Sequence, residues 1–306
     1  MALKALTGSL INKIRSFVKN HRVVVAVSGG VDSMTLMHVV AKSLPRDQIV
    51  VAHFNHASRK ESDRDELFVS KEAKKLGLVF ESEKLKKKPP KGQSKEDFWR
   101  QERLKYLRAL MARMQASFFM TAHHRDDVIE TFLFKLITGR TVAIPKEFDE
   151  DLKVYRPFLN IPKEDIQKLA TFLSVRFVTD KSNLDLKFDR NFIRHTLLTK
   201  IVERFGQKSL DNLHFAATNL SNLQDVVTEL IEFIFRFYPD LDKFSASKLA
   251  ADIKHLSNSV KVQIARVWLS KIAGKTFGYH HSKRFLDFLQ KKRSSIQLPG
   301  GLQFNQ

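Results

Sequence analysis

The sequence predicts an α/β fold in which a doubly wound, parallel sheet is followed by a smaller, mainly helical domain. From Val23 to Ile137, short apolar runs rich in β-branched residues alternate with segments whose apolar residues recur at helical spacing, as in parallel βαβ units. Polar motifs directly follow several of these runs, at the strand end where such sheets bind ligands. From Ser209 onward only the helical spacing remains. We therefore expect one domain at 1–208 and a second at 209–306.

The N-terminal segment, residues 1–20, is predicted to be an amphipathic helix rather than a signal peptide. Lys4, Lys13 and Arg15 interrupt its apolar residues, so it has no continuous hydrophobic region. Elsewhere, too, no run of about 20 apolar residues lacks charge, and a membrane-spanning helix is not expected. We expect a cytoplasmic protein with no membrane partner.

The first domain is predicted to alternate strands and helices, each bounded by residues that suit its end. Gly77 closes one helix at its C-terminal end, and Glu96 and Asp97 lie in the first turn of the next, where acidic side chains favour the positive end of the helix dipole. The predicted strands are 23–28, 49–54, 78–81 and 117–122. The predicted helices are 33–43, 62–76, 94–114 and 126–137.

The second domain is predicted to consist mainly of helices. Leucine, valine and isoleucine residues recur at helical spacing from Leu210 to Ile234. Three further helical patterns cover 246–256, 260–273 and 282–292. Gly274 ends the middle one, because glycine readily adopts the conformation that terminates a helix.

The chain carries a large excess of positive charge. Its 53 lysine and arginine residues against 33 aspartate and glutamate residues give a net charge of +20. Such an excess favours a polyanionic partner, nucleic acid first, because neutralising phosphates releases counterions. Part of it is clustered in the Pro-interrupted segment 84–91. A generally lysine-rich composition, and a basic loop that is merely solvated, are the alternatives.

The chain contains no cysteine. This excludes disulfides, zinc sites built on thiolates, and iron–sulfur clusters held by the chain itself. It also excludes a cysteine nucleophile or persulfide carrier.

The residues SGGVDS at 28–33 join a buried strand to a helix, and this context suits a phosphate-binding turn. Glycines let the backbone approach phosphate oxygens closely, and the following helix offers free N–H groups and its positive dipole end. The hydroxyls of Ser28 and Ser33 can add hydrogen bonds. The loop lacks the Gly-Lys-Ser/Thr of the Walker A motif, so it supplies no lysine for the terminal phosphates. Asp32 instead indicates a Mg²⁺ ion beside the anion.

A second polar cluster follows the strand at 117–122. Asp127 and Glu130 are three residues apart and share one face of the predicted helix. Two carboxylates at the carboxyl end of a strand can bind a cation, either Mg²⁺ or an ammonium group. An acidic cluster that only caps the helix is the alternative. His123 and His124 suit a nucleotide contact and a structural role equally.

The loop at 28–33 resembles the PP-loop of the N-type ATP pyrophosphatases, which share an adenine nucleotide alpha hydrolase-like fold. Members of this superfamily cleave ATP to AMP and pyrophosphate and adenylate a carbonyl-type oxygen of a second substrate. Further segments, over nearly the whole chain, resemble one family within it, the tRNA(Ile)-lysidine synthetases. These segments are HFNHASRKES at 53–62, the spacing of Glu96, Arg100 and Arg103, TAHHRDDVIET at 121–131, RPFL at 156–159, DKSN at 180–183, DRNFIR at 189–194 and LPGG at 298–301.

Two segments depart from that family's pattern. Asn55 and Ala57 stand where its DHGLRPES segment has Asp and Gly. The loop before RPFL, TGRTVAIP at 138–145, keeps only Gly139 of a glycine-rich stretch, so substrate gating there is expected to differ. The chain also has room for one C-terminal domain, whereas some family members carry two.

The resemblance implies roles for individual residues around ATP and lysine. Asp32, Asp127 and Glu130 are the expected catalytic residues. Asp32 is expected near the metal ion and the phosphates, and Asp127 and Glu130 are expected to hold the substrate lysine. The expected ATP-binding residues are Ser28, Gly29, Gly30, Val31, Asp32, Ser33, His53 and His56.

Four arginines are the expected tRNA contacts. Arg100 and Arg103 could neutralise phosphates or position RNA, and an exposed, ion-paired helix face is the alternative. Arg190 and Arg194 could bind an RNA backbone, and a link between the two domains is the alternative.

The resemblance further implies a reaction that uses ATP and Mg²⁺. The C2 oxygen of the wobble cytidine in the CAU-anticodon tRNA(Ile) is adenylated, and the ε-amine of free L-lysine then displaces AMP to give lysidine. The modification changes the codon specificity to AUA and the amino-acid identity from Met to Ile. The expected partners are therefore this tRNA and free lysine, and a homodimer is left open.

Three competing functions are weaker. A tRNA thiolase shares the loop and the polyanionic substrate, but such enzymes generally use cysteines, which this chain lacks. NAD or GMP synthetases do not account for the basic charge or for the segments after residue 155. A non-enzymatic RNA-binding module explains the charge and leaves the ATP loop and the carboxylates without a purpose.

Overall fold

The computed structural model describes residues 2–57, 61–90, 94–139, 144–179, 185–235, 251–274, 277–290, 294–299 and 301–305. The chain divides into two units, one made of Met1–Ile129 with Pro145–Lys200 and the other of Glu130–Ile144 with Ile201–Gln306. These units do not coincide with the predicted domains, 1–208 and 209–306. The second unit also includes residues 130–144, which contain the second half of the helix predicted at 126–137, and it begins again at Ile201. The functions expected of the two domains, catalysis for 1–208 and tRNA binding for 209–306, remain predictions.

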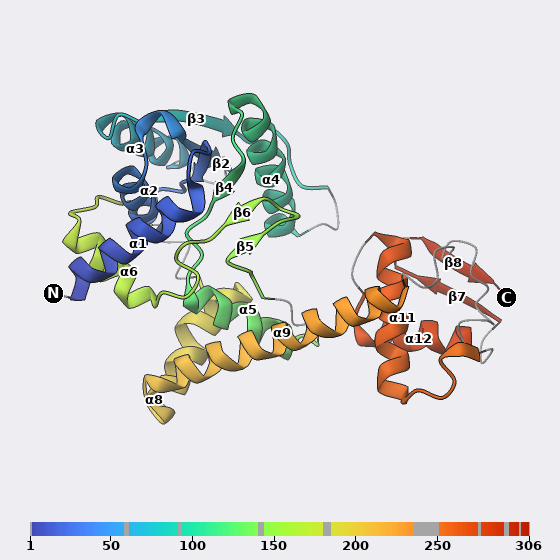
Figure 1. The fold of residues 1–306 in the computed structure, drawn as a ribbon. Helices are drawn as coiled ribbons and strands as arrows, with labels where there is room; N and C mark the ends of the chain where they lie inside the picture. The colour runs from blue at the N-terminus through green and yellow to red at the C-terminus, as the bar shows by residue number, and fades with distance from the viewer. Residues whose placement is uncertain are drawn as a thin grey trace. The chain divides into compact units, whose positions relative to one another are not determined.

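A six-stranded, mostly parallel sheet forms the middle of the first unit (Figure 1). Its order is β3-β2-β1-β4-β6-β5, and every pairing is parallel except that between β5 and β6. This confirms the predicted α/β class, while the short antiparallel edge was not predicted. The strands are β1 (Val23–Ala26), β2 (Ile49–Asn55), β3 (Val79–Lys84), β4 (Phe118–Met120), β5 (Phe148–Asp149) and β6 (Val154–Tyr155).

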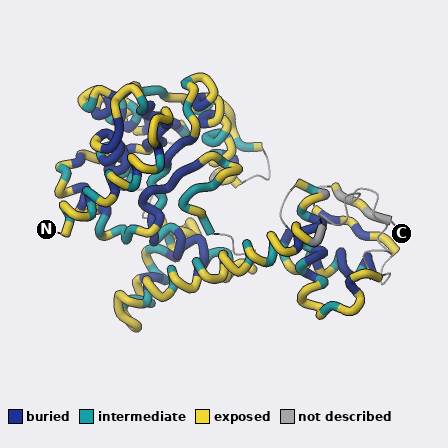
Figure 2. The backbone as a smooth tube through the Cα atoms, in the orientation of Figure 1, coloured by how far each residue is buried: buried dark blue, intermediate teal, exposed yellow. Residues whose placement is uncertain are grey.

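Helices cover both faces of this sheet because successive side chains of a strand point to opposite sides. Val23 and Val25 belong to a core that also includes buried residues of α1, α2, α3 and α6. Val24, between them, packs into a second core with buried residues of α4. Figure 2 shows buried segments running through the middle of this unit. The helices are α1 (Ala2–Val18), α2 (Val31–Ser43), the short 3₁₀ helix η1 (Arg46–Gln48), α3 (Ser62–Lys75), α4 (Lys95–Met114) and α6 (Lys163–Phe172).

The sheet order creates a switch point between β1 and β4. From β1 the chain moves to β2 on one side, and after β3 it returns to β4 on the other side of β1. The crevice outside the carboxyl ends of two such strands is the usual ligand site of a doubly wound sheet. Helix α2 begins at this crevice after β1, and helix α5 (Arg125–Ile137) begins there after β4.

Three short helical segments follow one another from residue 189. They are α7 (Asp189–Phe192), the π-helical turn η3 (Ile193–Leu197) and α8 (Leu198–Phe205). Single π-helical turns are uncommon and often lie at functional sites.

The C-terminal part of the second unit is mainly helical, as predicted, with a small hairpin that was not predicted. Trp268 and Phe285 pack against each other in its core, with their rings tilted by 34° and the ring centroids 4.9 Å apart. Ser257 caps one helix by accepting a hydrogen bond from the N–H of Val260 at 3.4 Å, and Gly274 ends the same helix with φ +63°. The elements are α9 (Lys208–Phe235), α11 (Asn258–Ala273), α12 (Tyr279–Leu289), β7 (Ser295–Leu298) and β8 (Leu302–Asn305).

Within the described residues, no helix is both long and apolar enough to cross a membrane.

Candidate active site

The loop at 28–33 forms the predicted turn between β1 and α2. Gly29 has φ +97°, a conformation that residues with a side chain rarely adopt, and Gly30 is the N-cap of α2. The first N–H groups of α2 have no partner within the helix and lie at its positive dipole end, so they can receive an anion. Val178 fixes the loop from outside by donating its N–H to the carbonyl of Gly29 at 2.9 Å.

The two serines hold this loop in shape. The backbone N–H of Ser28 donates to Oγ of Ser33 at 3.1 Å, and Oγ of Ser33 donates to the carbonyl of Gly30 at 3.1 Å. The two hydroxyl oxygens are also 3.1 Å apart. Because the single hydroxyl proton of Ser33 is committed to Gly30, Ser28 must be the donor in this pair. Ser33 is therefore engaged within the loop, whereas Ser28 is exposed.

Two histidines lie at the carboxyl end of β2, His53 within the strand and His56 just after it. His53 is buried, and its Nδ1 lies 2.8 Å from the carbonyl oxygen of Val27, to which it must donate because a carbonyl only accepts. Burial lowers the pKa of His53, so the neutral ring carries its proton on Nδ1 and presents Nε2 as an acceptor. Burial, the charge of Arg103 and His53 lower the pKa of His56 to about 4. Its ring packs near Trp99, with centroids 5.3 Å apart.

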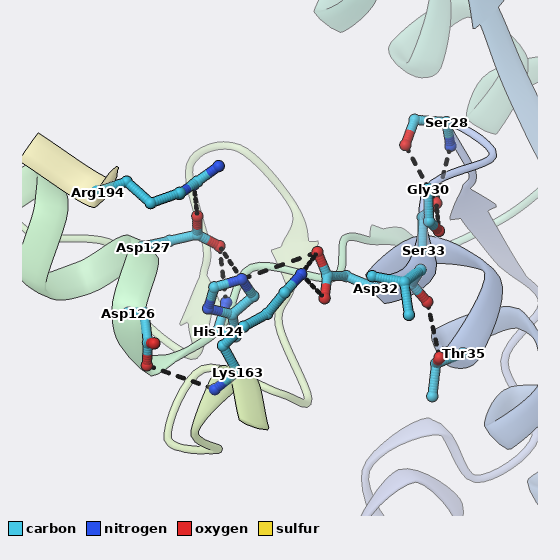
Figure 3. Close-up of polar contacts among 11 residues, drawn as sticks. Ser28, Gly30, Asp32, Ser33, Thr35, His124, Asp126, Asp127, Lys163 and Arg194 are labelled. Carbon is cyan, nitrogen blue, oxygen red and sulfur yellow. Dashed lines mark hydrogen bonds and ion pairs between the residues drawn. The ribbon is translucent and has the colours of Figure 1, made fainter. Parts of the chain in front are cut away.

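Figure 3 shows a row of polar side chains at the switch point, which we call the charge row: Lys163, Asp32, His124, Asp127 and Arg194. The Lys163 ammonium lies 2.5 and 2.6 Å from the two carboxylate oxygens of Asp32. Nε2 of His124 lies 3.8 Å from Oδ2 of Asp32 and 3.5 Å from Oδ2 of Asp127. Arg194 closes the row by donating to Oδ1 of Asp127 at 3.2 Å. Sequence positions far apart thus meet in one polar cluster.

Asp127 caps α5 and also contacts a guanidinium group from another element. Its Oδ2 accepts the N–H of His124 at 3.0 Å, which is half of a capping box at the start of α5. Its Oδ1 meanwhile faces Arg194. Burial alone would raise the pKa of Asp127, but the charges of His124 and His123, the His124 N–H and the Arg194 guanidinium together lower it below its ordinary value. Asp127 is therefore ionised at neutral pH.

Glu130 lies one helical turn after Asp127 on α5 and is 2% exposed. His123, which precedes the helix, hydrogen-bonds through Nδ1 to the hydroxyl of Thr121 at 2.7 Å. Burial lowers the pKa of His123 to about 4, against the opposing charge of Asp127, so this ring is neutral at neutral pH.

The donor set fits a magnesium ion that is shared with phosphates. No group of three or more His, Cys, Asp or Glu side chains among the described residues could hold a metal ion by itself. Mg²⁺ usually binds through one or two carboxylates together with waters and substrate phosphates, so such a group is not required. Asp32, in the first turn of α2, is the carboxylate that lies where phosphates are expected.

The arginines of α4 lie at the same side of the sheet as His56. Burial, followed by the charge of Arg100, lowers the pKa of Arg103, and Arg103 in turn contributes to the low pKa values of His56 and His123. Within the described residues neither arginine has a salt-bridge partner, and their contact with tRNA stays a prediction. The side chain of Glu96 is outside the described set.

The other two predicted tRNA contacts, Arg190 and Arg194, have different surroundings in the structure. Arg190 is exposed on α7, as an RNA contact requires. Arg194 lies on η3 and points to Asp127 (Figure 3). The segment at 180–183, residues 58–60, 91 and 140–143, Gly300 and the start of the helix expected at 246–256 lie outside the described residues.

Lys163 was missed by the sequence analysis. It is the first residue of α6, a helix that was not predicted. A signal was available, because Pro162 precedes it and Glu164 and Asp165 follow, and this order is typical of a helix start.

Residues 4–201 match the profile of the PP-loop domain family. The tRNA(Ile)-lysidine synthase of Thermotoga sp. (strain RQ2) is 29% identical over 74% of this chain and 57% of its own length. That of Petrotoga mobilis (strain DSM 10674 / SJ95) is 32% identical over 64% of this chain and 66% of its own. The chain thus spans little more than half the length of the first relative.

One solved structure has a similar fold. It is a U34-tRNA thiolase from Methanococcus maripaludis, with a TM-score of 0.59 over 72% of this chain and 80% of that chain. Since the two sequences are 18% identical, this likeness concerns the fold alone.

Proposed function

Since this chain belongs to the PP-loop domain family, we propose that it is an ATP-dependent ligase that joins free L-lysine to C2 of the wobble cytidine of the CAU-anticodon tRNA(Ile), forming lysidine. The observation that carries the proposal is the charge row at the switch point. In this row Asp127, an ionised carboxylate, approaches the same histidine as Asp32 of the loop, which supports a lysine site next to the proposed ATP site. The names of the similar proteins from Thermotoga and Petrotoga support the same activity.

The loop and α2 bind ATP in this proposal. The N–H groups at the start of α2 receive the phosphates, and the hydroxyl of Ser28 adds a bond when it turns from Oγ of Ser33 to the nucleotide. Ser33 and Gly29 keep the loop in its binding shape. Asp32 holds Mg²⁺, which when bound supplies positive charge against the departing pyrophosphate. Adenylation converts the cytidine C2 oxygen, a poor leaving group, into a good one.

Asp127 and Glu130 hold an ammonium group of lysine on α5. The low pKa of Asp127 keeps it charged at neutral pH, as this role demands. The attacking ε-amine must be neutral, so a group of the site or a phosphate takes its proton. His123, whose pKa is about 4, does not hold a proton at neutral pH and is in the form that can accept one.

The tRNA is proposed to contact Arg100 and Arg103 on α4, and Arg190 on α7 is proposed as a further contact. These side chains suit phosphate groups rather than base edges, so they position the RNA without selecting its sequence. Cytoplasmic location follows from a tRNA substrate. A homodimer stays a prediction that light scattering can test.

The test supplies ATP, Mg²⁺, radiolabelled lysine and unmodified CAU-anticodon tRNA, with a tRNA of another anticodon as the control. Lysine is expected to enter only the first RNA, with one AMP formed per lysine. Asp32→Ala is expected to abolish AMP formation while tRNA binding persists. Incorporation of sulfur instead of lysine would favour a thiolase, and AMP formation without tRNA dependence would favour a small-molecule substrate.

A further inference from the structure

Lys163 makes the closest charged contact of the site. Its ammonium is bonded to both carboxylate oxygens of Asp32, at 2.5 and 2.6 Å. The two side chains keep 29% and 27% of their surface exposed, so a ligand in the crevice can reach the pair. Ion pairs of this exposure contribute little to stability, about 0–1 kcal/mol. A purely structural purpose therefore explains the contact poorly.

The backbone fixes Lys163 relative to the loop. Its N–H donates to Oδ1 of Asp126 at 3.4 Å, and the N–H of Arg125 donates to the carbonyl of Ile161 at 3.0 Å. Ile166, one turn later, is fully buried in the sheet core and anchors α6. After α6 the chain returns to the loop, where Val178 bonds to Gly29. The ammonium is thus presented to the loop by a helix that is tied to it.

The loop itself provides no cation for a triphosphate. Residues 28–33 contain no lysine or arginine, and the start of a helix supplies only about half an elementary charge. The terminal phosphates of ATP carry most of the negative charge of the nucleotide. A side chain from another element must neutralise them, and within the charge row Lys163 is the cation that contacts the first turn of α2.

We infer that Lys163 is a phosphate-binding residue, which pairs with Asp32 in the absence of nucleotide and turns to the β- and γ-phosphates when ATP is bound. Both positions are compatible with one anchored backbone, because the lysine side chain is long and flexible. The movement leaves the carboxylate of Asp32 to a divalent cation, which would repel the ammonium if both stayed on the same oxygens. This inference rests on the proposed function, since it requires ATP at the loop.

The test compares nucleotide affinities of the full chain by calorimetry, with Mg²⁺ and without tRNA. Lys163→Met is expected to weaken binding of ATP and of pyrophosphate about 10- to 100-fold, which corresponds to the loss of one charge-assisted bond. The affinity for AMP, which lacks the β- and γ-phosphates, is expected not to change. Lys168→Met is the matched control, because Lys168 lies on the same helix and pairs with Glu164 in solvent.

Retained AMP binding also shows that the variant is folded, and Lys163→Arg is expected to restore most of the ATP affinity. Equal losses for AMP and ATP, or an unchanged ATP affinity in Lys163→Met, would overturn the inference. A wild-type chain that bound neither ATP nor AMP would instead refute the proposed function.

Discussion

The Asn55→Asp substitution should destabilise the first unit, although aspartate is the residue that the resembled family has at this place. Asn55 ends β2 and is 1% exposed. Its Nδ2 donates to Oδ1 of Asp63 and to Oε2 of Glu66, both at 2.8 Å, and its Oδ1 accepts the N–H of Ala57 at 2.9 Å. The amide therefore separates two carboxylates. Aspartate would remove both donors and add a third negative charge.

The magnitude follows from the part of this network that is shielded from solvent. Losing the bond to Glu66 costs about 1.5–3 kcal/mol. The hydrogen bond from Asn55 to Asp63 adds nothing to this sum, because the Asp63 carboxylate is fully solvated. Each unit by which the new carboxyl's pKa rises in the folded state costs a further ~1.4 kcal/mol at high pH. A group with a raised folded pKa keeps its contribution at low pH and loses it as the pH rises, so the destabilisation should be larger at pH 8 than at pH 5.

Urea unfolding followed by tryptophan fluorescence measures this effect. The chain has two tryptophans, so a Trp268→Phe background leaves Trp99 to report on the first unit. Asn55→Ala is the control, because it removes the same donors without adding charge and should lose about the same stability at both pH values. If Asn55→Asp is as stable as the parent, or its loss shrinks as the pH rises, the account of Asn55 as a spacer between carboxylates is wrong.

Three further predictions concern the loop, the histidines and the lysine site. Gly29→Ala should lower the free energy of unfolding by about 1–2 kcal/mol in the same fluorescence assay, because Gly29 has a positive φ. Gly30→Ala should lower it by less than about 0.5 kcal/mol, because Gly30 has φ −73° and the added Cβ would lie 3.8 Å from Ser28 Oγ. His56 and His123, with pKa values of about 4, should show no imidazole titration by NMR between pH 6 and 8, and their burial should lower stability as the pH falls below about 6.5. Asp127→Asn should lower lysine incorporation about 10²-fold and leave ATP affinity unchanged; an equal loss in both would assign Asp127 to the nucleotide instead.

The sheet and its helices were predictable because local patterns specify them. Strands β1 and β4 are continuous apolar runs and β2 begins with one, as expected for strands that are buried on both faces. The order of the strands and the switch point follow from the rules for parallel connections rather than from any one residue. Strands β5 and β6 were missed because each has two residues, too few for any periodicity. The hairpin of β7 and β8 was missed although a Pro-Gly-Gly turn signals it.

The candidate site was predictable only in part. Motifs located Asp32 and Asp127, because each lies in the first turn of the helix that follows a strand. No local pattern could reveal that Lys163 contacts Asp32, since 131 residues separate them and a crossover of the chain brings them together. Arg194 was expected at RNA, and its contact with Asp127 likewise depends on how η3 packs beside the start of α5. Tertiary ion pairs of this kind have no sequence period, so they are seen only in the structure.

In the charge row, each of the two carboxylates contacts a basic side chain from another element. Asp32 and Asp127 both approach His124, so the two carboxylates lie close together and like charges repel. Lys163 and Arg194 offset this repulsion from opposite ends of the row, and they come from different elements, so the balance depends on the fold. The proposed substrates would bring replacement cations, Mg²⁺ for Asp32 and an ammonium group for Asp127. Each would release a basic side chain next to a polyanion, so the pairing of Arg194 with Asp127 in the structure is compatible with its predicted contact to tRNA.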